Sequence, residues 1–219
     1  MLRDGDIDAL ARAGCEIVWI GAESGSQKIL DAMEKGTTVA QIAEAVARLR
    51  AAGVRVGFFL QFGYPGETRD DIEKTVQLVR DCQPDDIGVS VSYPLPGTKF
   101  YARVRAQIGV KQNWEDSSDL AMLYQGPFTT AFYRQLHTVI HKEFRARKNW
   151  SALRRALRTP RALRRRHLRQ AASAARHALT LPLARLRLNR LARQPHDSIG
   201  PLPPGMNQAA AATPSPQDE

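Results

Sequence analysis

Cysteine is scarce in this chain of 219 residues, which contains only Cys15 and Cys82. Two distant thiols do not form a disulfide framework, and they are too few for a four-iron cluster, which needs three or four thiolates. The chain also does not begin with the apolar run of an export signal. We therefore expect a reduced, cytoplasmic compartment.

Two further absences concern membranes and charge. The sequence has no run of 18 or more apolar residues, which argues against a membrane-spanning helix but leaves peripheral association with a membrane open. Residues 145–194 contain 16 Lys and Arg and no Asp or Glu, whereas residues 1–144 contain 16 Lys and Arg against 19 Asp and Glu. The net charge of +10 thus comes from one segment.

Three short strands are predicted from runs of β-branched and aromatic residues. They span residues 16–22, 54–62 and 87–93. A polar loop containing glycine ends each strand, at residues 21–26, 63–68 and 93–98. In the third strand Gly88, Ser90 and Ser92 alternate with larger residues, which predicts that one face lies against a bound molecule or a crowded barrel interior.

A helix is predicted after each loop. Ser26 is placed to cap a short helix over residues 27–33, and Thr38-x-x-Gln41 has the form of a capping box for a helix that ends at Gly53. Thr68 and Asp71 open the next helix, and another is expected over about residues 98–106. Repeated strand-loop-helix units predict a parallel sheet with a binding site at the carboxyl ends of its strands.

The last third of the chain changes in character. An amphipathic helix is predicted over residues 129–147, with Phe132, Leu136, Ile140 and Phe144 on one side. Residues 151–193 are rich in Arg, Leu and Ala and predict helices broken at Pro160 and Pro182, while residues 195–219 have a disordered composition. We divide the chain into residues 1–110, 111–150, 151–194 and 195–219.

The string Gly-Ala-Glu-Ser-Gly-Ser at residues 21–26, then Gly-Tyr-Pro-Gly-Glu-Thr and Tyr-Pro-Leu-Pro-Gly-Thr, resembles the second half of the radical SAM core. Within that family the sequence is most similar to the cobalamin-dependent (B12-binding) members grouped with the anaerobic magnesium-protoporphyrin IX monomethyl ester cyclase. It implies an α/β fold: strands 4 to 6 of a partial (βα)6 barrel, here followed by a basic helical extension. The Cys-x3-Cys-x2-Cys motif of the family is absent from this sequence.

The resemblance also implies cofactor-binding positions. Glu23 and Ser24 match the segment after strand 4 that contacts the ribose and methionine of S-adenosylmethionine (SAM). Gln61, Gly63 and Pro65 match the adenine-binding end of strand 5, and Tyr93 precedes the loop that closes over adenine. No catalytic residue and no metal ligand is assigned, since neither cysteine matches a cluster ligand.

The implied function is that of an N-terminally truncated radical SAM enzyme. The complete enzyme would act on a small-molecule substrate, use a 4Fe-4S cluster to cleave SAM to a 5′-deoxyadenosyl radical, and take cobalamin from a missing N-terminal domain. This chain alone is expected to be inactive. Two alternatives stay open: one half of a split enzyme, with the other half supplied in trans, and a non-catalytic basic module.

Three other features have competing interpretations. The basic segment 151–193 fits an anionic membrane surface, docking on the acidic body of the same chain, or, with less support, a nucleic acid, because aromatic residues are missing after Trp150. His137 and His141 are spaced for a metal but fit a solvated or interfacial pair better. Glu67 is either a general base or a first-turn residue that interacts with helix amides.

Overall fold

The computed structural model describes residues 4–108, 120–158 and 165–194. The helices and strands are α1 (Asp4–Arg12), β1 (Ile17–Glu23), α2 (Gln27–Ala32), α3 (Val39–Ala51), β2 (Arg55–Phe62), α4 (Arg69–Cys82), β3 (Asp86–Val91), α5 (Lys99–Val104), the 3-10 turn Arg105–Gln107, α6 (Thr130–Arg158) and α7 (Arg165–Leu191). The expected disorder of residues 195–219 and the polar stretch before residue 120 lie outside the described residues.

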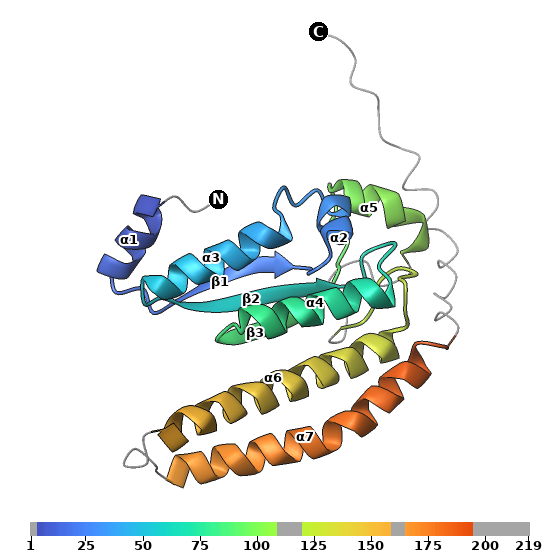
Figure 1. The fold of residues 1–219 in the computed structure, drawn as a ribbon. Helices are drawn as coiled ribbons and strands as arrows, with labels where there is room; N and C mark the ends of the chain where they lie inside the picture. The colour runs from blue at the N-terminus through green and yellow to red at the C-terminus, as the bar shows by residue number, and fades with distance from the viewer. Residues whose placement is uncertain (1–3, 109–119, 159–164, 195–219) are drawn as a thin grey trace.

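The three strands form one parallel sheet in the order β1-β2-β3 (Figure 1). Ile17 pairs with Arg55 at the start of the sheet, and Phe62 pairs with Val91 at its other end. The predicted parallel α/β arrangement of three strand-helix units is therefore confirmed. Further strands of a barrel are not part of the described structure.

One face of the sheet is buried under helices. Along β2, Val56, Phe58, Leu60 and Phe62 are each at most 1% exposed, because alternate side chains of a strand point to the same face. The buried side chains Leu49 of α3 and Ile72 of α4 belong to the same core. The apolar stripe predicted for α6 also belongs to it, with Phe132, Leu136 and Ile140 at most 3% exposed.

The opposite face of the sheet carries two stacked aromatic rings. Trp19 and Phe59 lie 4.7 Å apart between ring centroids and are 39% and 51% exposed. A Cβ on Gly57 would lie 2.5 Å from the Trp19 ring, and one on Gly88 would lie 3.1 Å from the Phe59 ring. The small residue Gly88, expected to lie against a molecule or a barrel interior, thus gives room to Phe59.

Local sequence determines how two of the helices begin. The capping box predicted at Thr38 and Gln41 is present at the start of α3. Thr68 and Asp71, predicted to open the next helix, form a second capping box at the start of α4. The predicted cap of α2 is different. Ser26 occupies the N-cap position but makes no capping hydrogen bond, because its hydroxyl donates instead to Asp71 Oδ1 at 2.6 Å.

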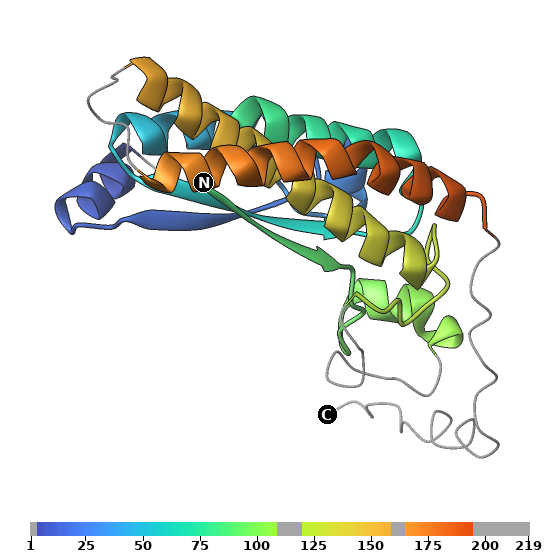
Figure 2. The same cartoon turned by 90° about the horizontal axis from the view of Figure 1, so that it is seen from below.

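Helices α6 and α7 run side by side and form a helical hairpin (Figures 1 and 2). α6 continues to Arg158, 11 residues beyond the predicted end at residue 147, and passes the change in composition at Trp150 without a break. The predicted break at Pro182 is wrong, because Pro182 lies inside α7. Pro160 lies outside the described residues.

No helix in the described ranges 4–108, 120–158 and 165–194 is long and apolar enough to cross a membrane.

Candidate functional site at the carboxyl ends of the strands

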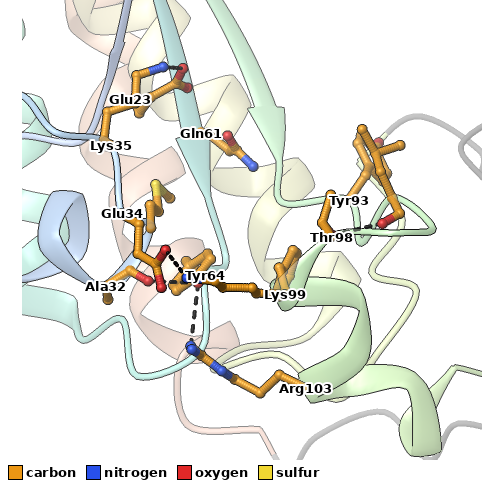
Figure 3. A pocket seen from close by; sticks show the side chains of 13 residues that line it. Glu23, Ala32, Glu34, Lys35, Gln61, Tyr64, Tyr93, Thr98, Lys99 and Arg103 are labelled. Carbon is orange, nitrogen blue, oxygen red and sulfur yellow. Dashed lines mark hydrogen bonds and ion pairs between the residues drawn. The ribbon is translucent and has the colours of Figure 1, made fainter. Parts of the chain in front are cut away.

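A cavity of about 410 Å³ lies where the three strands end (Figure 3). Its walls come from the end of β1, the α2–α3 turn, the end of β2, the loop after β3 and α5. The lining residues are Glu23, Ala32, Met33, Glu34, Lys35, Gln61, Tyr64, Tyr93, Leu95, Thr98, Lys99, Phe100 and Arg103. The volume is within the usual range for small-molecule sites.

Glu23 brings a carboxylate to the cavity from the last position of β1. Its backbone is left-handed, with φ of 54°, and the strand pairing is irregular between Gly21 and Glu23. Lys35 Nζ lies 2.8 Å from Glu23 Oε1. A Cβ on Gly21 would lie 2.7 Å from Glu23 Oε1 and 3.0 Å from Lys35 Nζ, so glycine makes room for this ion pair.

The rest of the turn after β1 packs against α4, away from the cavity. Ser24 is fully buried, and its hydroxyl lies 3.1 Å from the hydroxyl of Thr75. The Gly25 N–H donates to Thr75 Oγ1 at 2.9 Å, and a Cβ on Gly25 would lie 2.2 Å from the Lys74 carbonyl oxygen. The Gly and Ser residues of this turn therefore allow a close approach of two backbones.

Residues at the end of β2 also face two different ways, some toward the cavity and one toward the protein interior. Gln61 lines the cavity, whereas Gly63, with φ of 87°, is buried against Met122 and Tyr133. Tyr64 returns to the cavity: its hydroxyl donates to the Ala32 carbonyl at 2.8 Å. Since this bond joins the strand-end loop to α2, it fixes the Tyr64 ring as one wall.

The third wall is formed by α5 and the loop that precedes it. Tyr93 follows β3, and Thr98 caps α5 by accepting from the Tyr101 N–H at 3.1 Å. Lys99 Nζ lies 2.7 Å from Glu34 Oε2 across the cavity, and the bond from Lys99 holds the pKa of Glu34 below its ordinary value. Phe100 packs on Tyr64, with 4.9 Å between ring centroids.

Three of the six predicted cofactor residues, Glu23, Gln61 and Tyr93, line this cavity. Ser24, Gly63 and Pro65 do not; Ser24 and Gly63 are buried in the protein, and Pro65 is half-buried outside the lining set. The prediction of a SAM contact at each of the six positions stays a prediction. Sequence reasoning missed Tyr64, although it stands between two residues that were selected.

Sequence reasoning also missed the charged groups of the turn after α2 and of α5. Lys35, Glu34 and Lys99 line the cavity, and Arg103 Nη1 lies 3.4 Å from the Tyr64 hydroxyl. No local pattern marks them, because the pair Glu34–Lys99 joins residues 65 positions apart. Only the packing of α5 against the α2–α3 turn brings them together.

The donor set of the cavity fits an adenosyl amino acid such as SAM. Glu23 and Glu34 can accept from hydroxyl or ammonium groups, Lys99 and Arg103 suit a carboxylate, and the Tyr64 ring offers an apolar surface for a base. The described residues do not fit an iron-sulfur cluster. Cys15 and Cys82 lie at the amino-terminal edge of the sheet, opposite the cavity, and burial raises the pKa of the Cys82 thiol.

Glu67 is not among the residues that line the cavity. It is 3% exposed and accepts from the Gly63 N–H through Oε2 at 2.8 Å. The pKa of Glu67 is raised to about 8, chiefly by burial, against the lowering effect of the Gly63 bond and with a smaller raising effect of the Asp71 charge. Glu67 comes one residue before the N-cap Thr68, so it lies outside the first turn of α4 and the first-turn interpretation does not apply. The general-base interpretation stays a prediction.

The two histidines of α6 lie side by side outside the cavity, with their rings tilted by 51°. Their ring centroids are 4.3 Å apart, and burial, then the charge of His137, lowers the pKa of His141 to about 4. Among the residues that the structure describes, no group of three or more His, Cys, Asp or Glu side chains is arranged to hold a metal ion.

Comparison with known proteins supports one superfamily for the first part of the chain. A family profile described as the Radical SAM superfamily matches residues 1–79, from α1 into α4. An uncharacterized methyltransferase of Pyrococcus horikoshii is 32% identical over 108 residues, which cover 48% of this chain and 23% of that protein.

Two further relatives are enzymes whose names state their activities. The anaerobic magnesium-protoporphyrin IX monomethyl ester cyclase of Cereibacter sphaeroides is 33% identical over 99 residues, or 45% of this chain and 16% of that protein. A tRNA-2-methylthio-N(6)-dimethylallyladenosine synthase of Chromobacterium violaceum is 40% identical over 78 residues, or 35% of this chain and 18% of that enzyme. The chain thus spans less than a quarter of the length of these relatives.

Proposed function

We propose that residues 14–105 form the SAM-binding half of a radical SAM enzyme. The observation that carries the proposal is the convergence of Glu23, Gln61 and Tyr93, from three successive strand ends, on one cavity. The superfamily match over residues 1–79 supports this interpretation independently of the cavity. Parallel α/β folds bind ligands at this end of their strands.

Each wall of the cavity has a role in this proposal. Glu23 accepts from the ribose hydroxyls or the ammonium group of SAM, exchanging its bond with Lys35 for one with the ligand. Tyr64 and Tyr93 offer ring surfaces to adenine, and Gln61 supplies an amide to the edge of the base. A 4Fe-4S cluster would have to be held by residues other than the described ones, and it would supply the electron for reductive cleavage of SAM.

The open side of the sheet supports further strands in the complete enzyme. On β1 the edge that faces away from β2 pairs with no other strand of the described structure, and the Trp19–Phe59 pair beside it is exposed. An unpaired edge next to exposed aromatic rings favours pairing with additional chain. We propose that a cluster-bearing half covers both, joined in cis or supplied as a second polypeptide.

Cobalamin dependence is the finer part of the proposal. It rests on the similarity to the cyclase group and on no residue of the described structure. The coding sequence upstream of Met1 distinguishes the routes by which the cluster half arrives. An in-frame Cys-x3-Cys-x2-Cys motif supports one longer polypeptide, while a separate gene that encodes the motif supports a split enzyme.

Ligand binding is tested first on the chain itself. In saturation-transfer NMR with SAM, we expect contacts to the adenine and ribose protons, weakened by Glu23→Gln. Glu44→Gln is the control, because Glu44 is exposed on α3 and contacts only Arg48 at 3.9 Å. Equal transfer in the wild type and Glu23→Gln would remove Glu23 from the site.

The second test uses the chain together with a cluster-bearing half. Glu23→Ala should weaken SAM binding by about tenfold or more, the worth of one charge-assisted hydrogen bond, and leave the iron content unchanged. Loss of iron would mean that the substitution acts on the cluster half, and unchanged SAM affinity would contradict the assignment.

A non-catalytic basic module is the second candidate function. Its support is the α6–α7 hairpin, whose basic residues lie outside the matched segment 1–79. Absence of SAM binding in both tests, combined with binding of anionic vesicles or RNA through the hairpin, would favour this candidate.

A further inference from the structure

Helix α7 has one face fixed on α6. Ala174, His177, Ala184 and Leu188 are each at most 8% exposed. Lys142 Nζ donates to Thr180 Oγ1 at 3.0 Å, and Gln135 Nε2 donates to the Ala184 carbonyl at 2.9 Å. Arg185 Nη2 lies 2.6 Å from Glu143 Oε2. The rotation of α7 about its own axis is therefore set.

The opposite face of α7 presents leucines to solvent. The leucine stripe comprises Leu168, Leu179, Leu183 and Leu186, which are 73%, 77%, 70% and 65% exposed. Their spacing of eleven, four and three residues places them within one narrow band of a helix, at about 100° per residue. Exposed leucine is ordinary when single, but an aligned row of four is not.

Arginines accompany this stripe. Five exposed arginines lie within the band of leucines or next to it on the helix surface, at about 100° per residue. They are Arg165, Arg169, Arg176, Arg187 and Arg190. Helix α7 contains no Asp or Glu. The face therefore combines an apolar row with positive charge along most of the helix.

We propose that the leucine stripe and its arginines form a docking surface for anionic phospholipid. Transfer of leucine side chains out of water and attraction of arginines to an anionic membrane surface both favour this docking. A helix with this composition lies in the plane of the interface with its apolar side in the acyl boundary.

RNA matches the arginines but not the leucines. Phosphates would pair with the guanidinium groups, whereas exposed leucine has no partner on a nucleic acid backbone. α7 contains no Phe, Tyr or Trp on which bases could stack. The observations thus favour a lipid surface.

The position of α7 leaves the cavity accessible during such docking. In Figure 1 α7 lies on the far side of α6 from the sheet, and α5, which walls the cavity, lies on the opposite side of the molecule. Docking through α7 is compatible with a ligand at the strand ends, and it does not depend on the proposed SAM site.

The experiment is vesicle co-sedimentation of the full 219-residue chain. We expect binding to vesicles of phosphatidylcholine with about 30% phosphatidylglycerol, and at least tenfold weaker binding to phosphatidylcholine alone, from the loss of several charge contacts. The triple variant Leu179→Ser, Leu183→Ser, Leu186→Ser should lower the partition coefficient at least about tenfold. Leu95→Ser is its control, since Leu95 is 52% exposed but lies on the loop before α5.

The charge contribution is tested with Arg176→Gln and Arg187→Gln together. Their removal should weaken anionic-vesicle binding by roughly tenfold, while the same change at Arg12 and Arg55, exposed on α1 and β2, should not. Circular dichroism and the urea midpoint establish that each variant is folded. Equal binding to both kinds of vesicle, or no effect of the leucine variant, would overturn the proposal. Binding to single-stranded RNA that exceeds vesicle binding and is unaffected by the leucine variant would overturn it in favour of a nucleic acid.

Discussion

Replacing Glu67 by glutamine should make the chain more stable by about 4 kcal/mol at pH 8 and by less than about 1 kcal/mol at pH 5. Glu67 is 3% exposed, and burial raises its pKa to about 8 from the ordinary 4.5. Glutamine keeps an oxygen that can accept the Gly63 N–H, and its amide can interact with the buried hydroxyl of Tyr133, which lies beside the Glu67 carboxyl. The substitution therefore removes the ionisation with little change in shape.

The magnitude follows from the difference in pKa between the folded and unfolded chain. Below pH 4.5 Glu67 is protonated in both states, so it contributes no dependence on pH. Between pH 4.5 and 8 the unfolded chain loses the proton while the folded chain keeps it, so the free energy of unfolding falls by up to about 1.4 kcal/mol per pH unit. Above pH 8 the full cost, on the order of 5 kcal/mol, is present.

The assay is urea unfolding followed by circular dichroism between pH 5 and pH 9, on the wild type and Glu67→Gln. The difference between the two proteins cancels other titrations. His141 drops out in this way. Asp71 is coupled to Glu67, but bonds from Lys28, Ser26 and Thr68 hold its pKa low against the effect of burial, so it stays ionised over this range of pH. We expect the variant's advantage to grow from pH 5 to pH 8 and then to level off.

Glu44→Gln on the surface of α3 is the matched control and should show no such trend. The reasoning would be refuted if the difference in free energy of unfolding between the wild type and Glu67→Gln were the same at pH 5 and pH 8. The buried carboxyl would then titrate as it does in the unfolded chain.

Two further predictions concern the contacts that hold the helices. Gly25→Ala should lower the free energy of unfolding by about 1–3 kcal/mol, because its Cβ would lie 2.2 Å from the Lys74 carbonyl oxygen. Gly5→Ala, whose Cβ would have no atom within 4 Å, should be neutral or slightly stabilising. Thermal unfolding of the two variants checks this, and equal melting temperatures would contradict it. Glu143→Gln should cost about 2–3 kcal/mol, since its carboxylate, 9% exposed, lies 2.6 Å from both Arg80 and Arg185. Glu73→Gln, 64% exposed, should cost less than about 1 kcal/mol in the same urea titration, and a larger loss for Glu73 than for Glu143 would sink the argument.

Much of the local structure could be predicted because it depends on neighbouring residues. The capping pairs Thr38–Gln41 and Thr68–Asp71 lie three positions apart, so the start of α3 and of α4 follows from the sequence alone. The β2 strand follows from its apolar run in the same way. By contrast, Ser26 was predicted to cap α2, and a residue 45 positions away, Asp71, takes its hydroxyl instead.

Proline positions and changes in composition did not predict where the helices end, because packing between helices determines it. Pro182 lies inside α7, where contacts with α6 on both sides of it hold the helix together. The boundary placed at residue 150 on composition falls inside α6 for the same reason. Long-range contact thus overrides a local preference that costs a few kcal/mol.

The candidate site was predicted in part. Parallel strands place their carboxyl ends along one edge of a sheet, so Glu23, Gln61 and Tyr93 could be expected to meet. A turn at a strand end has two sides, however, and sequence does not say which side a residue takes. Ser24 and Gly63 face the protein interior, and Tyr64 faces the cavity.

The sequence by itself determined the strand-helix order, the parallel sheet, the edge at which the cavity lies and the location of the positive charge, because each depends on residue spacing within a few turns of chain. Only the tertiary structure decided that Glu67 is buried away from water, that Lys35 and Lys99 reach the cavity and that four leucines of α7 face outward. These depend on which distant segments pack together, and burial and exposure are properties of that packing.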